Sequence, residues 1–273
     1  MSIAHYQKKK QVFETFTIIV GFFVFIGFLM SIANPFIMII VIVFTGLIGL
    51  IITKAFKDLS NAYKIEHVKK TIEALVPHSN YDPIRGFTSE FVFQSKIVDK
   101  KSTFRSEDYL SGTINGKQFQ SADVHIQEVR SNGKSTTKIT AFQGRFFEIE
   151  FEKKFEFDVY ILPNKVRLFK SFYNMAKVDL ESINFNQTFD VFSGNQHSAF
   201  YLLKPRLMEK MIEFARIGKS VAFTFKDQFV YVAIDTRIDT FDLKMFRPLN
   251  DDHLEVVKKE VNMMFELIDL IET

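Results

Sequence analysis

A run of 39 residues without a single charge, Thr15–Thr53, constrains this chain more than any other feature of its sequence. A helix needs about 20 apolar residues to cross the hydrocarbon core of a bilayer, so the run is long enough for two crossings. Asn34-Pro35 interrupts it with a turn signal, and proline suits the first turn of a following helix. The pattern predicts a transmembrane hairpin with spans at about 16–33 and 35–53.

Two other interpretations of the apolar run stay open. Each span is short, so a re-entrant hairpin that enters the bilayer and returns is one alternative. A cleaved signal peptide is another, because lysines precede the first span and Ser31-Ile32-Ala33 resembles a cleavage site. Even then the second span would keep the mature chain in the membrane.

Lysines at the ends of the spans predict the orientation of the hairpin. The basic residues nearest the two spans all lie outside the Asn34-Pro35 turn; they are Lys8, Lys9, Lys10, Lys54, Lys57 and Lys64. Both flanks, and therefore both termini, are expected on the cytoplasmic side of the cell's inner or plasma membrane, which the chain would cross more than once. The bilayer is the first expected partner.

The charge balance and the cysteine count exclude several classes of function. Three lysines and one glutamate lie before residue 54, so the whole-chain counts of 35 basic and 32 acidic residues leave 32 and 31 beyond it. A nearly neutral domain argues against nucleic acid as a partner, because phosphates favour a basic face. The absence of cysteine excludes disulfides, thiol catalysis and thiolate metal sites.

Sequence periodicity divides the rest of the chain. Apolar residues at helical spacing over 54–76, with no helix breaker before them, predict a juxtamembrane helical stalk that continues the second span from about Pro35 to Val76. Residues 77–273 are predicted to form a cytoplasmic domain, with possible sub-parts at 77–166 and 183–273 joined near 167–182. The expected fold class is α+β: an N-terminal two-helix transmembrane hairpin, the stalk, and an antiparallel sheet with a C-terminal helix.

Several segments of the domain are assigned from local patterns. Residues 87–96 and 185–192 are predicted to be strands, and 197–203 and 205–218 to be helical. Asn115-Gly116 is the strongest short hairpin signal known, and two further hairpins are expected around 131–134 and 226–228. Asp252 and Glu255 match a capping box that opens a long amphipathic helix.

The stretch Phe147–Ile161 alternates apolar residues with acids, which predicts strands with one buried face. A three-residue loop at Glu152–Lys154 would pair Phe151 with Phe155 and keep the apolar residues on one face, so a hairpin is predicted here. The acids on the other face are expected to be hydrated. Their less favoured role is a site for a hard cation; they are Glu148, Glu150, Glu152, Glu156 and Asp158.

Four motifs, taken in order, resemble the bacterial membrane protein family called domain of unknown function 3137. They are Ser106–Gly112, Phe142–Phe147, Ala199–Lys210 and Val221–Ile234. The likeness covers most of residues 55–245. It implies a bacterial membrane protein with a cytoplasmic α+β domain, and it brings no reaction and no catalytic residue.

A search for catalytic patterns finds no nucleotide-binding loop, no nucleophile elbow and no zinc motif. His197 is the best lone candidate for a general base, with Asp190, Ser193 and Ser198 near it in sequence. Proximity in sequence is poor evidence for a triad, whose members usually meet only in the fold. No catalytic residue, cofactor or metal is therefore predicted.

The sequence favours a membrane-anchored binding or scaffold module that engages another protein. A lipid or headgroup binding module at the membrane surface is the first alternative, because a tethered domain is held near the bilayer at high local concentration. A membrane-tethered hydrolase using His197 and Asp190 is the less favoured one.

Overall fold

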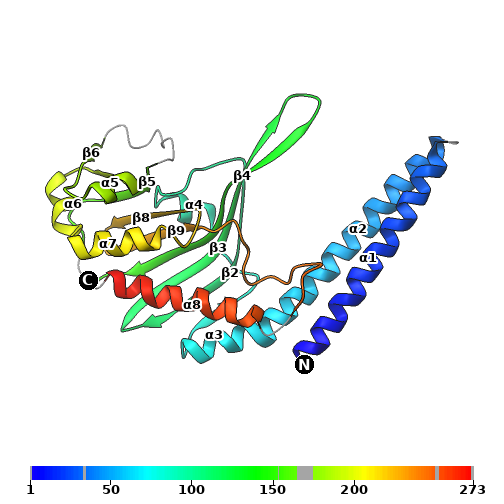
Figure 1. The fold of residues 1–273 in the computed structure, drawn as a ribbon, viewed down its shortest axis with the longest axis horizontal. Helices are drawn as coiled ribbons and strands as arrows, with labels where there is room; N and C mark the ends of the chain where they lie inside the picture. The colour runs from blue at the N-terminus through cyan, green and yellow to red at the C-terminus, as the bar shows by residue number, and fades with distance from the viewer. Residues whose placement is uncertain (1, 33–34, 153, 165–174, 250–251, 272–273) are drawn as a thin grey trace. The chain divides into compact units, whose positions relative to one another are not determined.

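The computed structural model describes residues 2–32, 35–152, 154–164, 175–249 and 252–271 (Figure 1). The chain divides into two compact units. We call residues 1–71 with 241–259 the hairpin unit, and residues 72–240 with 260–273 the sheet unit.

The hairpin unit is built from two long apolar helices, α1 (Ile3–Ser31) and α2 (Pro35–Tyr63). Both are long and apolar enough to cross a membrane, which confirms the prediction of two such helices. Gly27 lies where they meet: a Cβ added there would come within 2.6 Å of Val41 Cγ2. Asn34 lies outside the described residues.

The second helix continues beyond the apolar run, as its uninterrupted periodicity predicts. A five-residue π-helical segment, η1 (Lys64–Val68), follows α2 and leads into α3 (Lys69–Leu75). Such π-turns widen a helix by one residue and are frequent at functional positions. Here the widened turn contains Lys64, which is fully buried.

The sheet unit contains one nine-stranded sheet in the order β1-β2-β3-β4-β9-β8-β5-β7-β6, and neighbouring strands are antiparallel. The strands are β1 (Asn80–Asp82), β2 (Thr103–Ile114), β3 (Lys117–Ser131), β4 (Thr136–Glu150), β5 (Val159–Pro163), β6 (Ala176–Val178), β7 (Phe189–Ser193), β8 (Ser220–Lys226) and β9 (Phe229–Asp235). The helices are α4 (Ser89–Phe93), α5 (Ile183–Thr188), α6 (Gln196–Leu202), α7 (Pro205–Phe214) and α8 (Asp252–Ile271). The α+β class is confirmed.

The three turn-based hairpins are confirmed. Ile114 pairs with Lys117 across Asn115 and Gly116, whose φ values of 51° and 80° match a type I′ turn. The β3–β4 hairpin turns at residues 132–135, and the β8–β9 hairpin pairs Lys226 with Phe229. The helices predicted at 197–203 and 205–218 are also present, as α6 and α7.

Two predicted strands are wrong in whole or in part. Residues 87–96 contain the short helix α4, because Thr88 accepts a hydrogen bond from the Phe91 amide and caps it. Residues 185–192 begin in α5, which Ser182 caps in the same way, and only Phe189 onward is strand. In both cases a capped single turn replaces the extended backbone that the aromatic residues favour.

The predicted hairpin at 147–161 is also wrong. The β8–β9 hairpin lies between β4 and β5, so Phe147 pairs with Val232 of β9, and Ile161 pairs with Phe223 of β8. The rings of Phe151 and Phe155 do stack, at 5.0 Å between centroids, but in the connection between the strands.

Both faces of the central strands are buried. On one face, Phe146 of β4 packs with Tyr231 of β9 under aromatic residues of the α4 region. On the other face lie Phe147 and Ile149, both 1% exposed. The part of α8 from Glu260 onward packs on the sheet, where Asp269 accepts a hydrogen bond from Asn115 at the β2–β3 turn.

Gly144 allows β4 and β9 to approach each other in the middle of this sheet. A Cβ at this position would lie 2.0 Å from the carbonyl oxygen of Ile234, a backbone atom that cannot move aside. The β-bulge in β4 lies three residues before Gly144, between Thr140 and Phe142. There Ile126 pairs with Phe142 and the next residue, Gln127, pairs with Thr140, which leaves one residue of β4 without a partner in β3. Glycine is therefore needed here for close backbone packing.

Candidate functional sites

The residues considered for hydrolysis do not form one site. His197 is the second residue of α6 and its side chain is exposed, and its backbone amide donates to Asn195 Oδ1. Asp190 forms an ion pair of 2.7 Å with Lys177. Ser193 is three residues further along β7, so its side chain lies on the opposite face, where its hydroxyl donates to the carbonyl of Asp158. Within the described ranges, no hydrogen bond or ion pair links Asp190 to His197.

The acidic alternation of 148–158 does not form a common cation site. Glu148 is 8% exposed and accepts a hydrogen bond of 2.6 Å from Gln120. Burial raises its pKa, against a lowering effect of the hydrogen bonds from Gln120 and Tyr231. The prediction of a hydrated face is therefore wrong at this position, because Glu148 is buried and its carboxylate bonds to Gln120 and Tyr231 on the neighbouring strands. Asp158 instead accepts a hydrogen bond from Tyr160.

A buried charge cluster on the opposite face of the sheet was not predicted. Arg145 of β4 is 2% exposed. Its Nη1 donates to Asp123 Oδ1 at 2.9 Å, its Nη2 donates to the Asp108 carbonyl at 3.1 Å, and its Nε lies 3.2 Å from Glu260 Oε1. The hydroxyl of Tyr81 donates to the Asp108 carboxylate, which is fully buried. We call these five residues the Arg145 cluster.

A strand irregularity positions Asp108 in this cluster. The β2–β3 register shifts between Glu107 and Leu110, and Asp108 has a φ of 58°, in the left-handed region that aspartate tolerates better than most residues. The amide of Asp108 donates to the Pro83 carbonyl at the β1 end of the sheet. The backbone thus turns its carbonyl toward Arg145.

The electrostatics of the Arg145 cluster are asymmetric. Burial raises the pKa of Asp123 well above its usual value, although the nearby charge of Arg145 acts to lower it. Burial also raises the pKa of Tyr81, next to the Asp108 carboxylate. One guanidinium therefore faces more carboxylates than it can neutralise, and a proton is favoured at Asp123.

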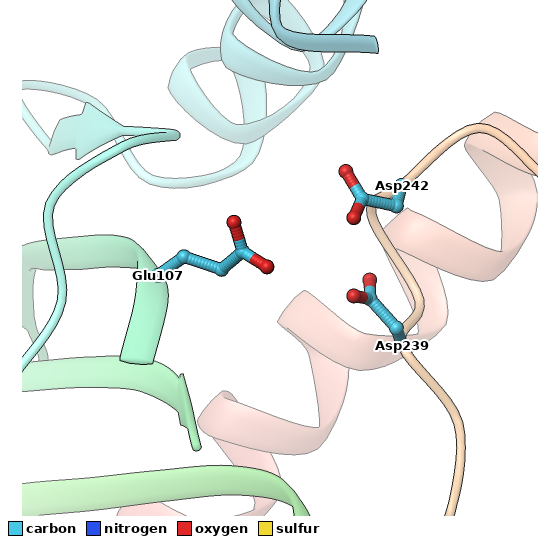
Figure 2. Close-up of side chains that lie close together, drawn as sticks. All are labelled: Glu107, Asp239 and Asp242. Carbon is cyan, nitrogen blue, oxygen red and sulfur yellow. The ribbon is translucent and has the colours of Figure 1, made fainter. Parts of the chain in front are cut away.

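Three carboxyl groups of the sheet unit approach one another, and two of them, Asp108 and Asp123, belong to the Arg145 cluster. Ligand atoms of Asp108, Asp123 and Asp239 lie within 4.8 Å of one another. Arg145 already supplies a positive charge to two of them, so the group is explained as part of an ion-pair network. Figure 2 shows Asp239, together with Glu107 of β2 and Asp242, which comes three residues later on the same connecting segment.

A second polar cluster lies within the hairpin unit. We call residues 241–259 the return segment, and its described residues pack on the N-terminal part of α1 and on the end of α2. Lys64 Nζ lies 2.5 Å from Asp242 Oδ1, and Ser60 donates to the same oxygen at 2.9 Å. Lys10, 1% exposed, donates to the Arg247 carbonyl and pairs with Glu14.

Asp242 is stabilised as a carboxylate in this position. Burial opposes its ionisation, but the charge and hydrogen bond of Lys64, with Lys57 and Ser60, lower its pKa to about 2. Backbone amides of the return segment also donate to the helices: Phe246 to Glu14 and Leu249 to Gln7. The segment therefore satisfies two buried lysines and ties the two helices together.

One cavity lies in the hairpin unit and another in the sheet unit, and they differ in volume and in the residues that line them. A groove of about 540 Å³ between α1 and α2 is lined by apolar and small residues, among them Val24, Met38 and Gly46. A cavity of about 100 Å³ in the sheet unit is lined by Phe142, Pro163 and Asp235 among others. Ligand pockets typically enclose 300–1,000 Å³, so this second cavity is too small for a drug-sized molecule.

Comparison with known proteins supports the resemblance inferred from the motifs. Residues 140–273 match the model of a family described as "Protein of unknown function (DUF3137)", which confirms the resemblance over that stretch. No curated protein matches the sequence. One similar solved structure is that of the mycobacterial trehalose monomycolate transport factor A, TtfA, at 9% identity and a TM-score of 0.42, over 74% of this chain and 91% of that chain.

Proposed function

We propose that this chain is a multi-pass membrane protein whose cytoplasmic domain, beginning near residue 77, docks another protein at the membrane. The two apolar helices supply the anchor, and the lysines outside the Asn34-Pro35 turn favour cytoplasmic termini. The docking role is non-catalytic. It is supported by the separate environments of His197 and Asp190, and by the small volume of the cavity beside Asp235.

The observation that carries this proposal is the exposure of large apolar side chains at one end of the sheet unit. Tyr201 and Phe200 of α6 are 82% and 47% exposed, and Ile183 of α5 is 72% exposed. Both helices pack on β7, and α6 also contacts β6, the last strand of the sheet. Aromatic residues are enriched in the cores of protein interfaces, and exposed apolar groups beside the last strand of a sheet are otherwise an aggregation hazard.

A loss-of-binding experiment tests this proposal. The tagged full chain would be purified from native membranes beside a Phe200→Ser/Tyr201→Ser variant, and co-purifying proteins would be compared quantitatively by mass spectrometry. We expect one protein to fall at least about ten-fold with the double variant, because a single aromatic hot spot contributes about 2 kcal/mol or more to an interface. Ile84→Ser is the matched control, since Ile84 is 71% exposed and lies in the β1–α4 connection.

The outcomes separate clearly. Loss with the α6 variant and retention with the Ile84 variant supports docking through α6. Equal recovery of every protein from all three chains would contradict the proposal. Equal loss with both variants would also contradict it, because binding would then not depend on α6.

A further inference from the structure

The β3–β4 hairpin extends beyond the rest of the sheet as a two-stranded ribbon (Figure 1). The last pair that β2 makes with β3 in this direction is Thr103 with Gln127, and β9 pairs with β4 only as far as Gly144. Beyond these positions β3 and β4 pair with each other alone, and residues 130–139 are all exposed. An isolated two-stranded ribbon is marginally stable and buries no core, so folding alone does not explain its presence.

The tip of this ribbon is an ordered turn. Asn132 Oδ1 accepts hydrogen bonds from the backbone amides of Lys134 and Ser135, at 3.1 Å and 2.8 Å. Gly133 has a φ of 82°, which the turn requires and which glycine adopts without strain. The turn thus presents Lys134 on a defined backbone at the far end of the ribbon.

Every charged residue on the ribbon beyond Glu128 is basic. No acid occurs between Glu128 and Glu148. Arg130 pairs with Glu128 at the base, at 3.0 Å, whereas Lys134 and Lys138 have no ion pair among the described residues. Arg130 and Lys138 have their side chains on opposite faces of the ribbon. Arg130 pairs with Thr137, whereas Lys138 pairs with Val129, the residue before Arg130. Basic side chains therefore lie at the tip and on both faces of the ribbon, which suits an extended anionic surface better than a one-sided pocket.

We propose that the β3–β4 hairpin, residues 130–139, docks on the anionic phospholipid surface of the bilayer. Headgroup phosphates match ammonium and guanidinium groups, and a membrane anchor keeps the sheet unit at high effective concentration near such a surface. Ile139, 41% exposed, adds an apolar side chain beside these cations. This contact is separate from the protein docking through α6, which involves other elements of the sheet unit.

The absence of cysteine from the chain allows a direct test. A single cysteine at Thr137, labelled with an environment-sensitive fluorophore, reports contact with spin-labelled lipid through quenching. The matched reporter is Gln118→Cys, an exposed position at the opposite end of β3. The full chain would be reconstituted in vesicles of phosphatidylcholine alone or mixed with phosphatidylglycerol.

We expect quenching at position 137 to increase with phosphatidylglycerol and to disappear at about 1 M salt, where the Debye length is about 3 Å. Lys134→Gln/Lys138→Gln should weaken the contact by about five-fold for each cation removed. The control variant Lys204→Gln/Lys219→Gln removes the same amount of charge from exposed residues that directly precede α7 and β8. It should leave the quenching at position 137 unchanged.

Three results would overturn the proposal: quenching at 137 that ignores lipid charge, quenching equal to that at 118, or equal effects of the two lysine pairs. If position 137 is shielded in native membranes but not in the protein-free vesicles that contain phosphatidylglycerol, the hairpin contacts a protein and the lipid assignment is wrong. Loss of lipid contact would leave the co-purification result for α6 unaffected, so the two proposals fail independently.

Discussion

Arg145 Nη1 donates a hydrogen bond of 2.9 Å to Asp123 Oδ1 on the buried face of the sheet, where β3 and β4 are neighbours. The second oxygen of Asp123 has no hydrogen-bond partner among the described residues. A buried carboxylate in this position is costly, and its neutral form is favoured. The pair therefore makes stability depend on pH.

The sign of this pH dependence follows from the raised pKa of Asp123, which burial causes despite Arg145. The charges that face it are Arg145, Glu260, Asp239 and Asp108. Between the unfolded value near 3.9 and the higher folded value, the folded chain binds more protons than the unfolded chain. The free energy of unfolding should therefore fall as pH rises through that window.

Asp123→Asn should remove the part of this slope that Asp123 contributes, because asparagine does not titrate. The melting midpoint of the purified full chain, followed in detergent as a function of pH, measures it. Asp227→Asn is the control, since Asp227 is an exposed turn residue with a φ of 54° that asparagine also tolerates. A slope that persists unchanged in Asp123→Asn would contradict this assignment.

Asp242→Asn should destabilise the hairpin unit by about 3 kcal/mol, because it leaves Lys64 buried without a carboxylate. Lys64→Met alone should cost less. In the double variant most of the loss should be recovered, since neither buried charge remains. Thermal unfolding of the four chains in detergent completes the cycle, and additive losses would show that the two residues do not interact.

Gly144→Ala should destabilise the sheet unit by at least about 2 kcal/mol, because the new Cβ would meet the Ile234 carbonyl oxygen at 2.0 Å. Gly194→Ala is the control: the nearest atom to its Cβ is Phe157 Cδ1 at 4.0 Å, an ordinary contact. Denaturation of both variants checks the prediction. Similar stability of the two would mean that β4 and β9 separate easily.

Cysteine labelling tests the proposed orientation. Ile32→Cys, at the end of α1 between the spans, should react with a membrane-impermeant maleimide added to intact cells. Gln118→Cys should react only after permeabilisation, because the sheet unit is proposed to be cytoplasmic. The reverse pattern would place the sheet unit outside the membrane, and no reaction at 32 in intact cells would favour a re-entrant hairpin.

Local signals predicted those parts of the fold that local chemistry determines. The charge-free run predicted the two apolar helices, and Asn115-Gly116 predicted a turn because both residues adopt a positive φ. The β4–β5 hairpin failed for a reason outside local sequence: two strands from residues 220–235 pair between them. The small helices α4 and α5 were missed because each is one capped turn inside an aromatic segment.

The charge clusters could be predicted only in part. Arg145, Phe147 and Ile149 are spaced two residues apart, so their side chains share one face of the strand. A charged residue among apolar ones on such a face indicates a buried charge. Its partners come from β2, β3 and α8, so their convergence depends on the sheet order. Asp242 likewise meets Lys64 only because the return segment packs on α2. The exposure of Tyr201 could be predicted only from the whole fold, since a tyrosine in a short helix is as often buried as exposed.

Site-specific photo-crosslinking at Tyr201 tests the central claim most directly. A photoreactive phenylalanine at this position in the full chain would be irradiated in native membranes, with Ile84 carrying the same group as the control. The account predicts one discrete crosslinked protein at 201, absent at 84 and lost with Phe200→Ser. Identical crosslinks at both positions, or none at 201, would contradict the proposal that α6 docks a protein at the membrane.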